Sequence, residues 1–150
     1  MGTFTQLTYQ IVFGGKYRSK FLQENAQDQL FAYIGGILKN MGCIPYIVGG
    51  HIDHLHLVFS ATGKYYIGKI VQNIKISSNA FMHDRTELFP DLINWQVGYG
   101  AFSYQRSKLN VLIEYVKTQK FHHETVSFKE EYIQLLEENG IEYDEKYLFI

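Results

Sequence analysis

The chain of 150 residues contains a single cysteine, Cys43, and this scarcity excludes several kinds of protein. One thiol forms no intrachain disulfide and builds no cysteine-rich zinc site. No apolar run approaches the roughly 20 residues that a membrane-spanning helix requires. The first residues also lack a charged segment followed by an apolar one, so we expect no signal peptide. Together these absences predict a protein of the reducing cytoplasm that does not enter a membrane.

The sequence also has few of the features that mark disorder or several domains. Hydrophobic residues make up 46% of the chain and charged residues 19%, which is typical of a folded domain. There is no internal repeat, low-complexity segment or linker. We therefore expect one domain over residues 1–150, large enough to bury a core.

The net charge of −1 conceals an uneven distribution. Residues 124–150 carry eight acidic side chains against two lysines, whereas residues 1–123 carry twelve basic and seven acidic ones. Binding to DNA depends on the local electrostatic field rather than on the total charge. A mildly basic body with an acidic helical end is compatible with phosphate binding, and equally with an ordinary solvated surface.

The spacing of apolar residues predicts four strands and four helices. The expected strands cover residues 3–13, 43–48, 51–59 and 93–104. The expected helices cover residues 23–40, 65–82, 108–121 and 127–139. Ser127 with Glu130 three residues later makes a capping box at the start of the last helix.

The order of these elements predicts an α+β fold of the ferredoxin-like, split βαβ type. Its antiparallel sheet would carry helices on one face and leave the other face open. Two C-terminal helices would be added to this unit. If the first two helices pack against Leu55, Leu57 and Phe59, then His54 and His56 look out from the open face.

His54-Leu55-His56 is the most informative motif of the chain. Side chains of a strand alternate between its two faces, so both imidazoles share one face. Two imidazoles one strand repeat apart can hold a metal ion. The residues alone leave a second interpretation open, in which the histidines face solvent or form hydrogen bonds.

Tyr115 and Gln119 lie four residues apart on the third expected helix and therefore share a face. If that face lies over the open sheet, they converge with His54 and His56. Two imidazoles and an amide oxygen could hold a divalent metal that polarises a phosphate. A tyrosine can form a covalent phosphotyrosine, although its pKa of about 10 means that it needs help to attack at neutral pH. No dedicated base is evident, and half-buried packing is the alternative role for such a tyrosine.

Several segments of the chain resemble, together, the single-tyrosine HUH transposases, which move small bacterial insertion sequences as single-stranded DNA. The resemblance covers nearly the whole length. The matching segments are Lys16-Tyr17-Arg18, the HUH core from Asp53 to Leu57, residues 73–78, the WQVGYGAFS segment of residues 95–103, Tyr115 to Gln119 with His122-His123, and residues 143–149. One departure is Gly14-Gly15 ahead of Lys16, where relatives more often carry Ser or Thr.

The resemblance implies specific roles. His54, His56 and Gln119 would bind Mg²⁺ or Mn²⁺, and Tyr115 would attack a DNA phosphate to give a 5′-phosphotyrosine and a free 3′-OH. The family acts as a homodimer that recognises DNA hairpins, and in many members the tyrosine helix completes the partner's site. Candidate DNA contacts are Lys16, Tyr17, Arg18, Lys69, Lys75, Ser77, Ser78, Arg106, His122 and His123.

Three other functions share part of this pattern. A replication initiator or relaxase would use the same chemistry but usually brings further domains. A non-enzymatic ferredoxin-like module that binds nucleic acid would explain the fold and the basic residues, but it would not require Tyr115, Gln119 and both histidines together. A small metallohydrolase would use water as the nucleophile and would tolerate the loss of Tyr115.

Overall fold

A four-stranded antiparallel sheet organises the chain, and the computed structural model describes residues 2–92 and 94–150 of it. The strands are β1 (Thr8–Gly14), β2 (Ile44–Gly50), β3 (His54–Ser60) and β4 (Gly100–Tyr104), in the spatial order β2-β3-β1-β4. This order and the antiparallel pairing confirm the predicted ferredoxin-like fold class.

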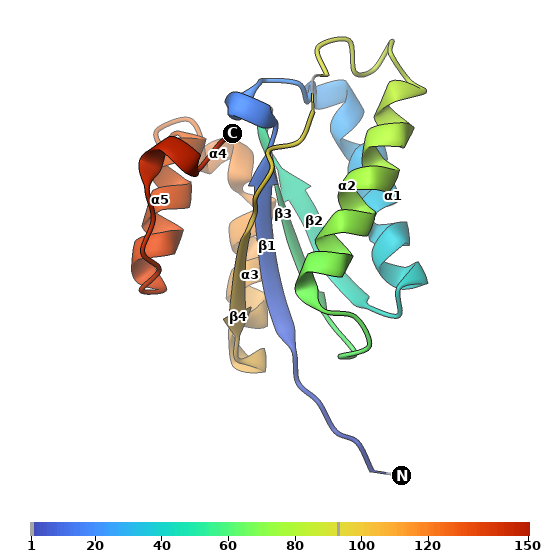
Figure 1. Ribbon diagram of the computed structural model, residues 1–150, viewed down its shortest axis with the longest axis vertical. Helices are drawn as coiled ribbons and strands as arrows, with labels where there is room; N and C mark the ends of the chain where they lie inside the picture. The colour runs from blue at the N-terminus through green and yellow to red at the C-terminus, as the bar shows by residue number, and fades with distance from the viewer. Residues whose placement is uncertain (1, 93) are drawn as a thin grey trace.

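Helices cover both faces of the sheet (Figure 1). The helices α1 (Glu24–Asn40) and α2 (Ile67–His83) pack on one face, and α3 (Leu109–Lys117), α4 (Gln119–His122) and α5 (Phe128–Glu138) lie on the other. Three single-turn 3₁₀ helices, η1 (Lys16–Arg18), η2 (Arg106–Lys108) and η3 (Glu145–Tyr147), complete the structure. None of the described helices is long and apolar enough to cross a membrane.

The face covered by α1 and α2 holds the larger apolar core. Leu55, Leu57 and Phe59 of β3 all point into it and are inaccessible to solvent. They pack with Leu30 of α1 and Ile74 of α2, which belong to the periodic apolar positions of these helices. The predicted alternation along β3 is therefore confirmed.

The opposite face is not open, which corrects the expectation that His54 and His56 look out from it. Both histidines have 0% exposed surface, because α3, α4 and α5 lie over them. Val58 of the same face packs with Leu112 and Val116 of α3. The added helices thus turn an expected surface into a second buried layer.

Gly49 of β2 lets α3 approach the sheet closely. It pairs with His56 across the strands, and a Cβ atom on it would lie 2.6 Å from Cγ1 of Val116. Such a distance is far inside van der Waals contact, so the absence of a side chain sets the height of α3 above the sheet.

The largest differences between the predicted and the observed element boundaries fall in three places. The first strand begins at Thr8 instead of residue 3, and the last begins at Gly100, although Trp95 forms an isolated bridge with Gly15. Ile93, expected to start that last strand, lies outside the described residues. The helix expected over residues 108–121 is divided at Thr118, whose φ of −98° and ψ of 18° leave the helical range.

The C-terminal residues tie several segments together. Backbone N–H groups of Tyr17 and Val97 donate to the carbonyls of Phe149 and Ile150, at 2.6 Å and 2.7 Å. The Gln96 side chain donates to the Leu148 carbonyl at 3.0 Å and accepts from the Gly14 N–H at 2.7 Å.

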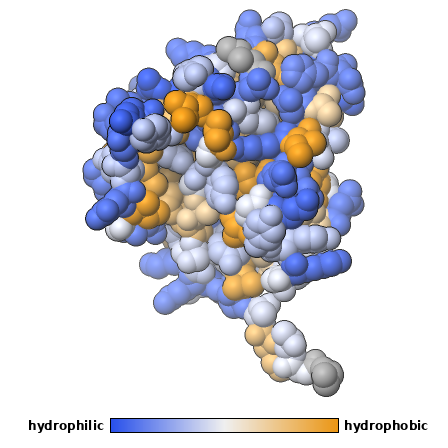
Figure 2. Space-filling model, viewed as in Figure 1, coloured by the Kyte–Doolittle hydropathy of each residue, from blue (hydrophilic) through white to orange (hydrophobic). Residues whose placement is uncertain are grey.

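On the side of the molecule shown in Figure 2, apolar side chains stand in small groups among polar ones.

A candidate metal and phosphate site

β3 supplies two imidazoles whose ring orientation is fixed by hydrogen bonds. Nδ1 of His54 lies 2.7 Å from the Asp53 carboxylate, and Nδ1 of His56 lies 2.8 Å from Oε1 of Gln10. Each partner atom is an oxygen that can only accept, so Nδ1 carries the proton in both rings. Nε2 of each ring therefore points into the space between the sheet and α3–α5, in the orientation that metal-binding histidines adopt.

His123 adds a third imidazole of the same orientation. It follows α4, and its Nδ1 lies 2.6 Å from the Val126 carbonyl oxygen. Its Nε2 lies 2.9 Å from Oε1 of Gln119, which is also 3.0 Å from Nε2 of His54. Three imidazole nitrogens and one amide oxygen thus converge on one point.

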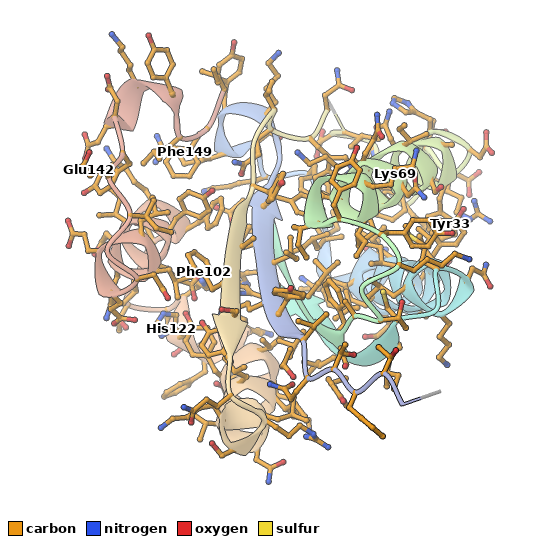
Figure 3. All side chains as sticks on the ribbon, turned by 60° about the horizontal axis from the view of Figure 1, so that its bottom comes forward. Tyr33, Lys69, Phe102, His122, Glu142 and Phe149 are labelled. Carbon is orange, nitrogen blue, oxygen red and sulfur yellow. The ribbon has the colours of Figure 1, made fainter. Side chains whose placement is uncertain are left out.

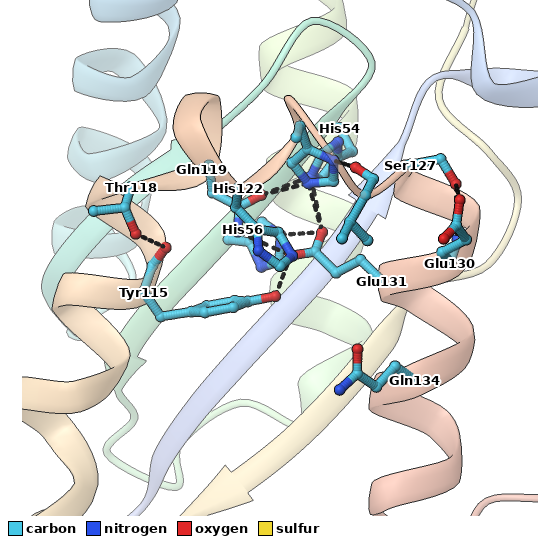
Figure 4. A network of polar contacts seen from close by, with 12 residues as sticks. His54, His56, Tyr115, Thr118, Gln119, His122, Ser127, Glu130, Glu131 and Gln134 are labelled. Carbon is cyan, nitrogen blue, oxygen red and sulfur yellow. Dashed lines mark hydrogen bonds and ion pairs between the residues drawn. The ribbon is translucent and has the colours of Figure 1, made fainter.

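Glu131 of α5 occupies that point. Its Oε1 lies 3.1 Å from Nε2 of His54, 3.1 Å from Nε2 of His56 and 3.0 Å from Nε2 of His123. Its Oε2 accepts from Nε2 of Gln119 at 2.9 Å and from the Tyr115 hydroxyl (Figure 4). Glu131 is 2% exposed, so these partners replace the water that a carboxylate would otherwise need.

Nitrogen and oxygen donors of this kind suit a divalent cation. Ligand atoms of His54, His123 and Glu131 all lie within 4.8 Å of one another, and Gln119 and His56 adjoin them. Carboxylate and amide oxygens suit Mg²⁺ and Mn²⁺, and imidazole nitrogens suit divalent transition-metal ions. The residues present therefore fit a metal site.

The buried groups shift one another's pKa values. Burial disfavours the charged form of His54, but the Asp53 and Glu131 carboxylates outweigh it and raise the pKa of His54 to about 9. Burial prevails at His56 and lowers its pKa. Burial would raise the pKa of Glu131, but the histidines around it hold that pKa far below its usual range.

Tyr115 faces this cluster from α3. Burial, followed by the negative charge of Glu131, raises the pKa of the Tyr115 hydroxyl above its ordinary value. The hydroxyl is therefore protonated and donates to the carboxylate. A cation at the centre of the cluster would change this balance, because its positive charge opposes the effect of the nearby carboxylate on the Tyr115 hydroxyl.

The N-terminal cap of α5 and the contact of its first residue with His54 position this helix against the cluster. The Ser127 hydroxyl accepts from the Glu130 N–H at 3.1 Å, as the predicted capping box requires. The Phe128 ring stacks on the His54 imidazole, with centroids 4.2 Å apart and planes at 4°. A Cβ atom on Gly14 would lie 2.7 Å from the Phe128 ring, so a residue without a side chain is needed there.

The structure brings together most residues of the predicted site and separates others from it. His54, His56, Tyr115 and Gln119 converge within one chain, and His122 and His123 join them. Lys69 lies on α2, across the sheet from His122 (Figure 3). The ammonium of Lys75 donates to the carbonyls of residues 96, 97 and 98 at 2.6–3.2 Å, and Ser78 is fully buried against Trp95.

Sequence reasoning missed Glu131 and placed His123 among the candidate DNA contacts. A signal for Glu131 was available. It lies on the apolar stripe of α5 with Phe128 and Leu135, and an acidic residue within such a stripe is buried only when it is paired. The orienting role of Gln10 could not be read from the sequence, because Gln10 lies on a different strand from the histidines.

Comparison with known proteins identifies relatives of the chain. The sequence pattern of the family described as "Transposase IS200 like" matches residues 3–119. A candidate transposase from Deinococcus radiodurans superposes with a TM-score of 0.58 and 22% identity, over 79% of this chain and 95% of that one. A REP-associated tyrosine transposase, described as bound to a REP hairpin, superposes with a TM-score of 0.57 and 15% identity, over 84% and 76%. A search of curated proteins finds no match.

Proposed function

We propose that this chain, which belongs to the family of IS200-like transposases, cleaves and rejoins single-stranded DNA with Tyr115 as its nucleophile. The Tyr115 hydroxyl oxygen attacks a backbone phosphorus atom, and the bond from that phosphorus to the 3′ oxygen breaks. The products are a 5′-phosphotyrosine on the protein and a free 3′-OH. Attack by another 3′-OH on the phosphotyrosine rejoins the strands.

The contact between Tyr115 and Glu131 carries this proposal. The hydroxyl donates to Oε2, so the carboxylate takes up the proton as the oxygen bonds to phosphorus and passes it to the leaving 3′ oxygen, since its low pKa keeps it from retaining that proton. The sequence offered no such proton acceptor. Oε1 of the same carboxylate faces the three imidazoles, so one side chain links the nucleophile to the candidate metal ligands.

His54, His56, His123, Gln119 and Glu131 would hold the cation, which we propose to be Mg²⁺ or Mn²⁺. When bound, the cation polarises the scissile phosphate and neutralises part of its developing charge. Asp53 and Gln10 keep two of the imidazoles in the orientation that binding needs. The buried setting excludes water, which would otherwise compete with Tyr115 for the phosphate.

Residues of η1, directly after β1, are the first candidates for DNA contacts. Tyr17 is 68% exposed, and Tyr17 and Arg18 both have φ of 58°, a left-handed conformation that L-residues rarely adopt. We infer that this backbone presents Lys16, Tyr17 and Arg18 to the nucleic acid, with Tyr17 available to stack on a base. Lys69, Ser77 and Arg106 are further candidates, whereas Lys75 and Ser78 are engaged within the fold.

Hairpin recognition and dimer formation belong to the same proposal. The REP-associated neighbour is described with a hairpin, and a hairpin is the substrate that we propose here. We also propose a homodimer that works on cytoplasmic DNA. Tyr115 lies against the histidines of its own chain, so each protomer of such a dimer would use its own tyrosine.

The test is the formation of a covalent adduct. Wild-type protein is incubated with single-stranded oligonucleotides from the flanks of its gene, with Mg²⁺ or Mn²⁺, and separated under denaturing conditions. We expect a protein–DNA band that Tyr115→Phe lacks entirely and that chelation of the metal prevents. Tyr33→Phe, an equal change on α1 across the sheet, is the control and should keep the band.

Two outcomes would overturn the proposal. Full cleavage by Tyr115→Phe would favour a hydrolase that uses water. Hairpin binding by wild type without any adduct or cleavage would favour a module that only binds nucleic acid.

A further inference from the structure

A cavity of about 260 Å³ lies directly beside the ring of Tyr115, between α3 and α5. Gln10 of β1 and Tyr104 of β4 form its floor. Tyr115, His122 and Glu131 close its inner end, so whatever fills the cavity touches the nucleophile. In Figure 4 the space lies below the Tyr115 ring, toward Gln134 of α5.

The side walls of the cavity are apolar. Val111 and Leu112 line it from α3, and Leu135 lines it from α5. Its volume is below the roughly 300–1,000 Å³ of pockets that enclose drug-sized ligands. Its volume and apolar walls therefore suit one ring system.

The charge of the cavity excludes a phosphate as its occupant. Away from the candidate metal ligands the cavity is lined by Glu138, and its described lining includes no lysine or arginine, with the histidine His122 only at the inner end. A DNA backbone needs cations around its phosphates, whereas a base carries no charge. When the scissile phosphate binds at the cluster, the part of the nucleotide that the cavity accepts is thus its base.

Polar atoms at the rim can read the edge of a base. Nε2 of Gln134 donates to Oε1 of Glu138 at 3.0 Å, which leaves the Gln134 amide oxygen and the second Glu138 oxygen as acceptors. The Tyr104 hydroxyl accepts from Nε2 of Gln10 at 2.9 Å and keeps its own proton to donate. Acceptors of this kind pair with the exocyclic amino group of adenine, cytosine or guanine, which thymine lacks.

We propose that this cavity binds the base of a nucleotide that directly flanks the scissile phosphate, with preference for a base that carries an amino group. The inference rests on the proposed function and deepens it, because it adds a base-binding subsite to the nucleophile. Insertion of the base would hold the scissile phosphate beside Tyr115, and it would select cleavage sites by their flanking base.

The experiment compares substrates and variants in the rate of adduct formation. Once the cleaved junction has been mapped with wild-type protein, the base on either side of it is removed or replaced by thymine. We expect the abasic change on one side to slow adduct formation roughly 5- to 150-fold, the range that loss of one base–aromatic contact produces. Thymine should give an intermediate rate.

Val111→Trp is the protein counterpart of the abasic substrate. Val111 is 67% exposed, so the larger ring can enter the cavity without disturbing the core. It should slow the parent substrate to the rate of the abasic one and leave the abasic substrate unaffected. Asn110→Trp, an equal addition at the neighbouring exposed position outside the cavity, should change neither rate.

The outcomes separate the cavity from the proposed function. If the parent substrate forms an adduct, but abasic substrates on both sides react equally fast, the subsite is wrong and the nucleophile stands. Equal slowing of parent and abasic substrates by Val111→Trp would also overturn the subsite. Absence of any adduct with wild-type protein would overturn the proposed function and the subsite with it.

Discussion

His54 and Leu55 are neighbours on β3, both are inaccessible to solvent, and they enter opposite faces of the sheet. Around Leu55, apolar side chains of α1 and α2 gain stability from being removed from water. Around His54, three imidazoles, an amide and a tyrosine share a single carboxylate. The comparison teaches that equal burial can rest on nonspecific packing or on a network in which every polar group depends on its partners.

The largest expected effect tests the apolar face. Leu57→Ala should lower the free energy of unfolding by about 2–5 kcal/mol, because it removes buried methyl groups and leaves a cavity. Its neighbour Val58 points to the other face, beneath α3. Compared with Leu57→Ala, Val58→Ala should lower the free energy of unfolding less but slow adduct formation more, because it weakens the packing of α3, the helix that carries Tyr115. Urea unfolding measures the loss of stability, and the adduct assay measures the loss of rate. If Val58→Ala lost more stability and Leu57→Ala lost more rate, the two faces would not differ in the way described.

The next effect tests the polar face. With metal chelated, Glu131→Gln should lower the free energy of unfolding by about 1–3 kcal/mol, because charged hydrogen bonds to the imidazoles are lost. Glu130→Gln, its exposed neighbour on α5, is the matched control and should change stability by less than about 0.5 kcal/mol. Equal urea midpoints for the two variants would mean that the network adds nothing to folding.

The smallest effect concerns the Lys75 ammonium, which lies at the rim of the apolar core. Burial lowers the pKa of Lys75 to about 8, and its Nζ lies 5.1 Å from the Phe13 ring centroid. Between pH 8 and about pH 10 the unfolded chain holds this proton and the folded chain releases it, so the free energy of unfolding should rise with pH. Partial exposure keeps the rise below about 1 kcal/mol.

Lys75→Met supplies the reference for that measurement. It lacks the titrating group, so the difference in unfolding free energy between wild type and variant isolates the contribution of Lys75. A difference that stays flat, or falls, from pH 8 to pH 10 would show that the carbonyls of residues 96–98 keep the ammonium charged.

Much of the fold could be predicted because its signals are local. Alternation of Leu55, Leu57 and Phe59, and the helical spacing of Leu30, Ile34 and Leu38, depend only on neighbours along the chain. The order of elements then sufficed for the sheet topology. The break at Thr118 was not predictable in this way, since Tyr115 and Gln119 fit a continuous helix equally well.

The site could be predicted only in part, because its completion depends on distant contacts. The alternation of side chains along a strand places His54 and His56 on one face. The convergence of Tyr115 and Gln119 with them depended on the assumption that the third helix lies over that face. Glu131 meets them only because α5 folds back over the sheet and Phe128 stacks on His54. No spacing of residues along the chain predicts that α5 folds back over the sheet.

The position of the nucleophile Tyr115 depends on Gly49, a residue that takes no part in the chemistry. Because α3 rests on it through Val116, each atom added there would lift the helix and move the adjoining Tyr115 away from the cluster. For protein engineering, Gly49 is therefore a position at which the distance between α3 and the sheet can be changed. Substitution there would tune the reach of the nucleophile while leaving the ligands, the proton acceptor and the base cavity chemically unchanged.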